Sequence, residues 1–209
     1  MNNGKIFNNT ASVSSTVTTV RGGGVLMYGN FIMEDGEISN NEIVANSLSN
    51  VVEIYGGGVC VVQSSFTMKG GRITGNTASS TNSMSAGYGG GVHVSGISGY
   101  PGTFIMQGGE ISGNTISANY FSRGGGVHVG TNAVNNLNFS SFIKTGGIVT
   151  GYADNSTTGN VAKNSSGTIQ TNQGHAVYAS DPVRRRETTA GLTDNLNTST
   201  AGVAGGWEN

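Results

Sequence analysis

Apolar and polar residues alternate along short stretches of this chain, and glycines separate one stretch from the next. Residues 66–68 (Phe-Thr-Met) and 72–74 (Arg-Ile-Thr) show the alternation in two neighbouring stretches. A period of two is typical of β-strands, whose successive side chains point to opposite faces, whereas a helix has a period of about 3.6 residues. The pattern therefore predicts short β-strands rather than helices.

The same phrases return at a nearly constant interval. GGGV begins at Gly22, Gly56, Gly89 and Gly124, with spacings of 34, 33 and 35 residues. The phrase F-x-M follows each of the first three motifs, and G-x-I-[ST]-x-N follows that phrase. A last, degenerate copy of GGGV is 174–177 (Gly-His-Ala-Val). Internal repeats of this length indicate a solenoid, in which each repeat adds one coil.

Short strands of this kind bury their apolar face only when coils stack, with like positions about 4.8 Å apart. We therefore predict an all-β, right-handed parallel β-helix of about five coils and three parallel sheets. It forms one domain, with the coils in 1–180 and a capping segment in 181–209. The interior ladders predicted by the repeat are Val25, Val59, Val92, Val127 and Val177; Phe31, Phe66, Phe104 and Phe142; Met33, Met68 and Met106; and Ile6, Ile38, Ile73 and Ile111.

Two polar ladders follow from the same register. Lys5, Glu37, Arg72 and Glu110 occupy one outward position in successive coils, and their charges alternate in sign. Opposite charges on neighbouring strands stabilise a sheet modestly. Asparagines recur where the third predicted strand ends, so that their amides can hydrogen-bond along the stack. This second ladder consists of Asn9, Asn41, Asn76 and Asn114.

Coil length varies because residues are inserted at two corners. One corner holds the predicted loops 12–21, 45–55, 79–88 and 117–123, and the other lengthens from 28–30 to 95–103 and then 130–141. Insertions on one face of a repeat protein often form its binding surface. The predicted ligand-binding residues are the aromatic and arginine residues on these rims: Tyr55, Tyr88, Tyr100, Tyr120, Phe121 and Arg123. The alternative is that they cover sheet edges.

Composition narrows the classes of partner. The net charge of −1 supplies no electrostatic reason to bind nucleic acid. Eighteen consecutive apolar residues, as a membrane span needs, do not occur. Cys60 is the only cysteine, which excludes a disulfide framework and a zinc cage of thiolates. No cofactor is predicted.

The phrases GGGV-x-V and F-x-M-x-GG-x-I-[ST]-G-N-T, with the closing GGW of residues 205–207, resemble repeats of large bacterial surface proteins with right-handed β-helix regions. Polymorphic outer-membrane proteins are a more distant likeness. The chain departs from the pattern at Lys144 and Tyr152, where methionine and asparagine are expected. The resemblance implies an extracellular or cell-surface location and a role in adhesion or display, with glycan or protein as partner at the loop rims.

The leading interpretation is therefore a non-catalytic surface scaffold, and the alternative is a carbohydrate-active β-helix enzyme. Glycoside hydrolysis needs two carboxyl groups about 5–10 Å apart. Glu37 and Glu110 share a ladder, but Arg72 lies between them and favours the ionised form of both. We therefore predict that the chain is not an enzyme.

Metal binding is a weaker alternative. Leu26, Cys60, His93, His128 and Tyr178 form a predicted outward ladder, in which a thiol and two imidazoles lie side by side. These groups bind zinc or copper, but ligands along a flat sheet do not converge tetrahedrally. An outward site that tolerates varied residues explains the ladder equally well, and no metal is predicted.

Self-association is predicted from a neighbouring outward row, which includes Ile32, Ile105 and Ile143. An exposed apolar stripe is unusual on a soluble monomer. At the C-terminal end, Trp207 is expected to pack over the last coil, and residues 184–186 (Arg-Arg-Arg) to lie in a solvated turn. The chain begins in mid-coil without a signal peptide, so we expect an upstream continuation of the solenoid that carries the export signal.

Overall fold

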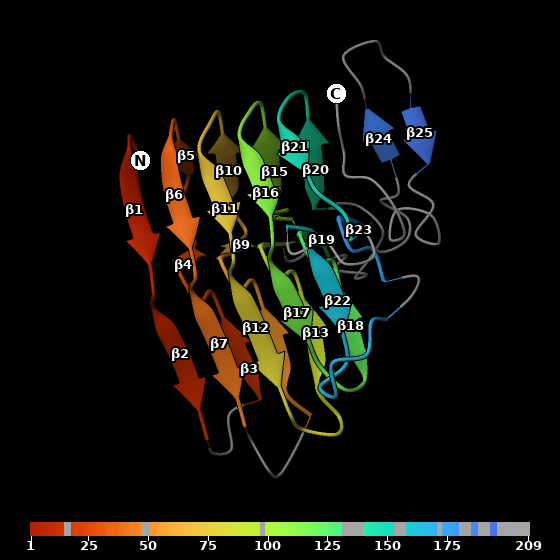
Figure 1. Cartoon of the computed structure of the whole chain (residues 1–209). Coiled ribbons are helices and arrows are strands. Elements are labelled where there is room, and N and C mark those ends of the chain that lie inside the picture. Colours follow the sequence, from red (N-terminus) through yellow and green to blue (C-terminus); the bar gives the residue numbers. More distant parts are fainter. Residues whose placement is uncertain are drawn as a thin grey trace.

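The computed structural model describes residues 1–14, 18–46, 51–96, 99–130, 140–152, 158–170 and 173–179, and the backbone of 185–187 and 193–195. Every named element in these residues is a β-strand. The strands stack as a parallel β-solenoid of about four turns (Figure 1). The front strands run downward while the chain advances from left to right, which makes the solenoid right-handed.

Each coil passes through five parallel sheets in the same order, which we name A to E. Sheet A contains β1 (Gly4–Phe7), β6 (Gly36–Ser39), β11 (Arg72–Thr74), β16 (Glu110–Ser112) and β21 (Ile148–Val149). Sheet B contains β2 (Thr10–Val13), β7 (Glu42–Ala45), β12 (Thr77–Ser80), β17 (Thr115–Ser117) and β22 (Val161–Lys163). Sheet C contains β3 (Thr19–Arg21), β8 (Glu53–Tyr55), β13 (Ala86–Tyr88) and β18 (Phe121–Arg123).

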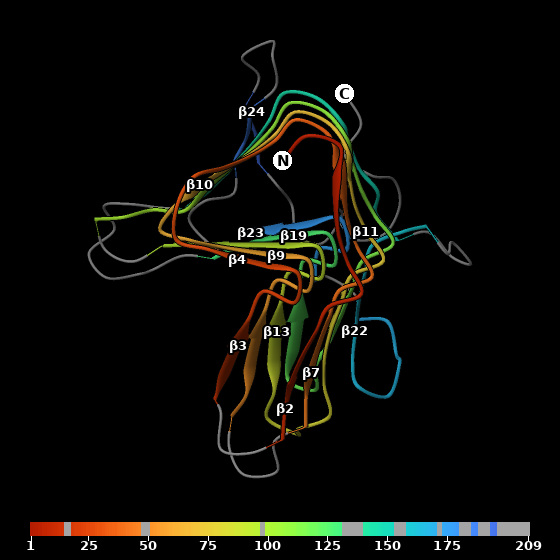
Figure 2. The same cartoon turned by 90° about the vertical axis from the view of Figure 1, so that its left-hand side faces the viewer.

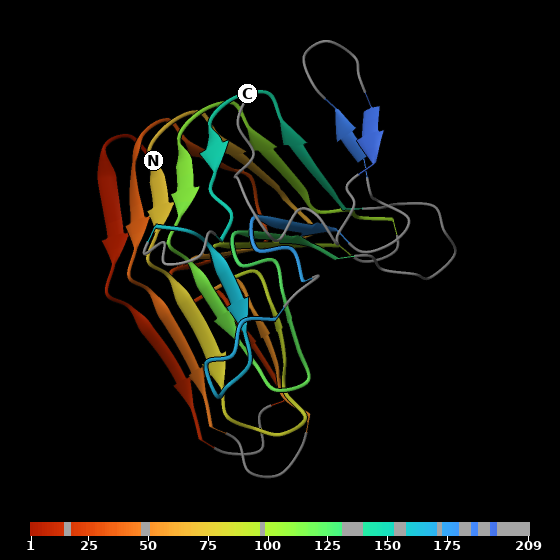
Figure 3. The same ribbon diagram turned by 45° about the vertical axis from the view of Figure 1, so that its right-hand side comes forward.

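Two further parallel sheets complete each coil. Sheet D contains β4 (Val25–Met27), β9 (Val59–Val62), β14 (Val92–Ser95), β19 (Val127–Val129) and β23 (Val177–Ala179). Sheet E contains β5 (Phe31–Met33), β10 (Ser65–Met68), β15 (Thr103–Met106) and β20 (Ser141–Lys144). An antiparallel pair, β24 (Arg185–Glu187) with β25 (Thr193–Asn195), lies beyond the stack (Figure 3).

The cross-section of the solenoid has two lobes (Figure 2). Sheets A, D and E enclose the larger core, which contains the predicted valine, phenylalanine, methionine and isoleucine ladders. Sheets B and C face each other and enclose a narrow second core around Ile43, Ile54 and Ile116. The sequence pattern therefore underestimated the number of sheets, and its estimate of about five coils was slightly high.

Sheet C lies in the segments predicted as loops, and sheet B lies largely between the predicted third strand and those segments. Residues 77–80 (Thr-Ala-Ser-Ser) form β12, and 86–88 (Ala-Gly-Tyr) form β13. Small and hydroxylated side chains give almost no apolar alternation, so the strand period is hard to recognise there. These strands form because parallel neighbours on both sides pair with them along the stack.

The predicted ladders of the larger core are confirmed residue by residue. Phe66 pairs with Phe31 on one side and Phe104 on the other, and Phe142 follows. Ring centroids of successive phenylalanines lie 4.8–5.6 Å apart, with the rings stacked. Lys144 occupies the position after Met106 in the methionine ladder and is buried there, as the departure from the repeat predicts.

The asparagine ladder lies at the waist between the two lobes, where each coil passes from sheet A to sheet B. Asn76 illustrates the pattern: its backbone N–H and its Nδ2 both donate to Oδ1 of Asn114, at 3.0 and 2.9 Å. The same Nδ2 also donates to the carbonyl oxygen of Ile38 in the preceding coil at 2.9 Å. Asn41, Asn76 and Asn114 thus each tie three consecutive coils together.

The next rung of this ladder is Asn160, not Tyr152, which stands where a constant repeat would place an asparagine. Asn114 donates from its backbone N–H to Oδ1 of Asn160 at 3.0 Å. Asn160 lies beside Thr150 although nine residues separate them in sequence, since its N–H donates to the Thr150 carbonyl oxygen at 3.1 Å. An insertion between β21 and β22 therefore displaces the asparagine by eight positions from where a constant repeat puts it.

The glycine triplets pack against this ladder. The first glycine of each triplet has a left-handed backbone, with φ of 68° at Gly56 and 74° at Gly89. The third glycine has no room for a side chain: a Cβ at Gly91 would lie 3.0 Å from Nδ2 of Asn114 and 2.7 Å from the carbonyl oxygen of Gly126. The motif GGG thus allows sheet D to begin in contact with the asparagines of the next coil.

Residues 174–177 fit the same explanation. A Cβ at each earlier third glycine meets the asparagine of the following coil, but no further coil follows in the described part of the chain. His175 and Ala176 therefore replace the second and third glycines, and both are buried.

The predicted cap is residues 181–209, and most of it lies outside the described residues. Trp207 and Arg184 are among the residues that are not described. Only the backbone of β24 and β25 is described in this segment, so the capping role stays a prediction. The described residues contain no helix with the length and apolar character needed to cross a membrane.

Replacing the third glycine is expected to destabilise the stack. Gly91→Ala places a methyl group against backbone and the asparagine ladder, and should lower the free energy of unfolding by about 2 kcal/mol or more. Gly29→Ala is the control, because nothing lies within 4 Å of a Cβ there, and should change the free energy by less than about 0.5 kcal/mol. Urea unfolding followed by circular dichroism measures both; equal stabilities would contradict the packing explanation.

Candidate functional site

Sheets C and D meet at a re-entrant corner of the cross-section (Figure 2). Two rows of side chains contact each other there. The corner row comes from the last residue of each sheet C strand: Arg21, Tyr55, Tyr88, Arg123 and then Gln173. The histidine row comes from the middle of each sheet D strand: Leu26, Cys60, His93, His128 and Tyr178.

The histidine row has the predicted register, but the prediction that it faces solvent was wrong for its three central members, whereas Leu26 is 44% exposed. Cys60, His93 and His128 are 0, 2 and 3% exposed. The tyrosines of the corner row cover them: the ring of Tyr55 lies 4.6 Å from that of His93, and Tyr88 lies 4.9 Å from His128. Because the row was expected on an outer face without neighbours, repeat spacing alone did not reveal this cover.

The two histidines are directly hydrogen-bonded. Nδ1 of His93 lies 3.1 Å from Nδ1 of His128, and the rings are stacked with centroids 5.0 Å apart. One ring donates and the other accepts, so the accepting ring is neutral. Burial and the nearby Arg21 lower the pKa of His93 to about 3, and burial, His93 and Arg123 lower the pKa of His128.

Cys60 continues this row as a neutral thiol, because burial raises its pKa to about 12. A thiolate is the form that binds metals and attacks electrophiles. Within the described ranges, no group of three or more His, Cys, Asp or Glu side chains has an arrangement that could hold a metal ion. The corner thus differs from a zinc or copper centre.

Arginines border the tyrosines at both ends of the corner row. Cζ of Arg21 lies 5.3 Å from the ring centroid of Tyr55, and Tyr55 stacks on Tyr88 at 5.1 Å. Cζ of Arg123 lies 4.9 Å from the ring of Tyr178 and 4.3 Å from that of Phe121. Burial, with Glu53 nearby, raises the pKa of both Tyr55 and Tyr88, so both remain neutral phenols.

Three buried polar atoms in this corner have no hydrogen-bond partner among the described residues: Nε of Arg123, Nε2 of His128 and Oε1 of Gln173. All three belong to its C-terminal end. Buried polar groups without partners are rare in folded proteins. Sequence reasoning did not identify Gln173, although it precedes the degenerate GGGV as Tyr55 and Tyr88 precede theirs.

The predicted rim residues do not form one surface. Tyr55, Tyr88, Phe121 and Arg123 lie on sheet C and are half-buried. Tyr120 is 65% exposed beside Phe121, with ring centroids 4.1 Å apart. Tyr100 is 67% exposed and belongs to the other rim, between sheets D and E. The structure therefore brings five of the six together, and Tyr100 lies apart.

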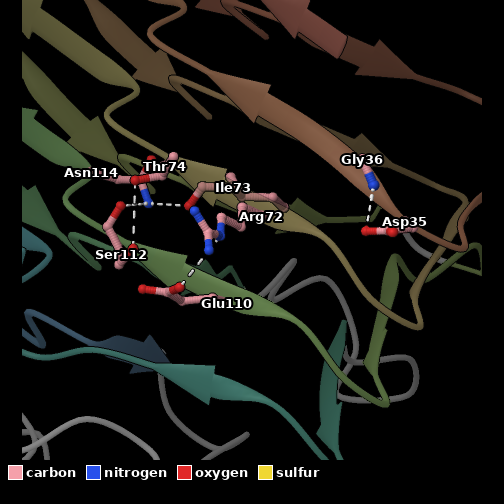
Figure 4. A network of polar contacts seen from close by, with 8 residues as sticks. All are labelled: Asp35, Gly36, Arg72, Ile73, Thr74, Glu110, Ser112 and Asn114. Carbon is pink, nitrogen blue, oxygen red and sulfur yellow. Dashed lines mark hydrogen bonds and ion pairs between the residues drawn. The ribbon is translucent and has the colours of Figure 1, made fainter. Parts of the chain in front are cut away.

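A second surface feature is a shallow trough on the outer face of sheet A, with a volume of about 490 Å³. Lys5, Glu37, Arg72 and Glu110 form one side of it, in the predicted order. Nζ of Lys5 lies 3.2 Å from Glu37, and Nε of Arg72 lies 3.8 Å from Glu110. Figure 4 shows Arg72 reaching across to Glu110, while Asp35 lies apart beside Gly36.

The floor of the trough is backbone. Gly36, Gly71 and Gly109 occupy one position in successive coils, with φ of 113°, 82° and 85°. A Cβ at Gly71 would lie 2.4 Å from the Gly36 carbonyl oxygen, so side chains are excluded there. The trough runs along the stack, because its lining residues come from like positions of four coils. Sequence reasoning identified the charged ladder but not the trough beside it.

The predicted apolar row on sheet E is confirmed in register: Ile32, Thr67, Ile105 and Ile143 follow one another. Ile32 is 47% and Ile143 37% exposed, whereas Ile105 is half-buried. Self-association along this face stays a prediction.

No protein-family model, curated protein or solved structure matches the chain. The family resemblance suggested by the repeat phrases therefore has support from the solenoid architecture alone.

Acid should destabilise the protein through its histidines. All three are buried with lowered pKa values, about 3 for His93 and about 4 for His175, whereas the unfolded chain takes up protons near 6.5. Their contribution is complete above pH 6.5 and is lost as the pH falls toward these values. Each histidine should cost up to about 2 kcal/mol by pH 5.

Urea unfolding at pH 7, 6 and 5 measures this effect; these values lie above the range in which most carboxylates titrate. His93→Asn should reduce the proton uptake on unfolding and flatten the curve by about one third, since one histidine of three is removed. A stability that does not change between pH 7 and pH 5 would contradict the burial of neutral histidines.

Proposed function

We propose that the chain is a non-catalytic binding scaffold of the cell-surface type, and that it holds an extended, neutral glycan in the trough on sheet A. The observation that carries this proposal is the ladder of alternating hydrogen-bonding groups along a floor of bare backbone. Lys5 and Arg72 donate, whereas Glu37 and Glu110 accept.

The spacing of these groups suits a linear polymer. Successive strands lie about 4.8 Å apart, so the trough repeats one donor or one acceptor at that interval. A sugar unit in an extended chain advances by a similar distance and offers hydroxyl groups, each able to donate and accept. A glycan parallel to the solenoid axis would thus meet a donor and an acceptor in turn at successive units, and its hydroxyl groups can pair with both.

The charge of the trough favours a neutral ligand. Its side chains comprise two cations, Lys5 and Arg72, and three carboxylates, Asp35, Glu37 and Glu110. The cations are engaged by neighbouring carboxylates, so little attraction remains for an acidic polymer. Hydroxyl groups do not need a counter-charge.

The carboxylates of the trough are better suited to binding than to catalysis. A glycosidase requires a carboxyl group that stays protonated near neutral pH. Here a hydrogen bond with Ser39 and the contact with Lys5 lower the pKa of Glu37. Glu110 pairs with Arg72, which lies between the two carboxylates. A cell-surface or extracellular location is part of the proposal and accords with a glycan ligand.

The test uses soluble neutral polysaccharides (galactomannan, xyloglucan and hydroxyethylcellulose) beside the acidic polygalacturonate, in affinity electrophoresis and calorimetry. We expect binding to at least one neutral polymer, with little change between low and high salt. The double variant K5A/R72A removes both donors and should weaken binding at least roughly tenfold. Release of reducing ends should not occur.

Lys69→Ala is the matched control. It also breaks an exposed ion pair between neighbouring coils, Lys69 to Glu34 at 2.9 Å, but directly after the strands of sheet E and outside the trough. Its affinity should equal that of the wild type. Failure of all three neutral polymers to bind, or an equal loss in the control, would refute the trough as the binding site, and reducing-end release would support an enzyme instead.

A further inference from the structure

The C-terminal end of the corner between sheets C and D has the properties of a second binding site, separate from the trough on sheet A. Nε of Arg123, Nε2 of His128 and Oε1 of Gln173 are buried, and none has a hydrogen-bond partner in the described residues. Leaving such a group unpaired in a buried place is unfavourable. Three of them at one end of one corner indicate that a ligand completes their bonds.

The three side chains are neighbours by register. Gly89 and Gly124 donate from their backbone N–H groups to the carbonyl oxygens of Arg123 and Gln173, at 2.9 Å in both cases. Arg123 and Gln173 therefore occupy consecutive places in the corner row. Tyr178 connects this row to His128, since Cζ of Arg123 lies 4.9 Å from its ring and its ring stacks on His128 at 5.5 Å.

The orientation of Arg123 is largely set before any ligand arrives. Its guanidinium lies 4.3 Å from the ring centroid of Phe121 and 4.9 Å from that of Tyr178, so aromatic rings hold it in place. A side chain that is already ordered loses little entropy on binding. Arg123, Gln173 and Tyr178 are half-buried, so each reaches the surface although the unpaired Nε and Oε1 atoms are buried.

The chemistry of the three atoms specifies the ligand class. Arg123 is a permanent cation whose Nε can only donate, and it forms no ion pair with another described residue. The expected partner of Arg123 is therefore an anionic oxygen of the ligand. Oε1 of Gln173 can only accept, so the ligand must also carry a donor such as a hydroxyl group.

Nε2 of His128 can bind either the anionic oxygen or the hydroxyl group of such a ligand. Its Nδ1 is engaged with Nδ1 of His93 at 3.1 Å, so Nε2 remains for the ligand. If His93 donates in that bond, Nε2 of His128 carries a proton and donates; in the other tautomer it accepts. Both histidines are buried and neutral, and thus leave Arg123 as the charge that selects the ligand.

We propose that Arg123, His128 and Gln173 bind a small hydroxycarboxylate such as a sugar acid, with the carboxylate on Arg123 and an adjacent hydroxyl group donating to Gln173. The rings of Tyr178 and Phe121 border the site and face the apolar side of the ligand. This site does not depend on the proposed glycan trough, which lies on another sheet.

The experiment compares three probes by calorimetry: galacturonate, which has both groups, galactose, which lacks the carboxylate, and acetate, which lacks the hydroxyl groups. Galacturonate should bind saturably, and at least tenfold more tightly than either of the others. Arg123→Met and Gln173→Leu should each weaken galacturonate binding at least tenfold while retaining the circular dichroism spectrum of the wild type.

Arg21→Met is the matched control, because Arg21 stands at the other end of the same row and lies 5.3 Å from the ring of Tyr55. Its galacturonate affinity should equal that of the wild type, and all three variants should retain the polysaccharide binding attributed to the trough. Equal binding of acetate, an equal loss in Arg21→Met, or a crystal structure at saturating galacturonate with only water on the three atoms would overturn the proposal.

Discussion

The contact between buried asparagines and glycine triplets at the waist is the constraint on which the solenoid depends. Each asparagine side chain satisfies backbone groups of neighbouring coils, as Asn76 does with Ile38 and Asn114. The bonds form only because the third glycine of each triplet leaves space beside the amide, as Gly91 does beside Asn114. Two lobes with separate cores can therefore share one chain path, because their junction is narrow and hydrogen-bonded.

The stacked lobes generate two kinds of surface. Where the repeat is regular, it copies the same position every coil, and the result is a periodic face such as the charged ladder on sheet A. Where the repeat changes, as from Tyr88 to Arg123 and Gln173 along the corner row, a site arises that occurs once. A periodic face suits a polymer, whereas a single site suits a small molecule. The two proposed ligands differ for this reason.

The repeat phrases were sufficient to predict the parallel coils, the interior ladders and the order of the charged and asparagine ladders. These features depend on like residues at a constant interval, which a sequence displays directly. Sheets B and C were not predicted, because residues such as 77–80 (Thr-Ala-Ser-Ser) owe their strand structure to neighbours in other coils. The burial of the histidines was not predicted, because the side chains that cover them come from the packing of sheet C against sheet D. The period along a strand carries no information about how two sheets meet.

The asparagine ladder also divides the chain into equivalent units, each running from one ladder asparagine to the next. The chain from one ladder asparagine to the next, for example from Asn41 to Asn76, contributes every strand of a coil and ends in the environment in which it began. The extra residues between Thr150 and Asn160 show that the number of residues between two ladder asparagines can differ while the hydrogen bonds of the ladder are kept. Lengthening the solenoid by duplicating such a unit would thus require no new type of contact, only one more copy of those already present.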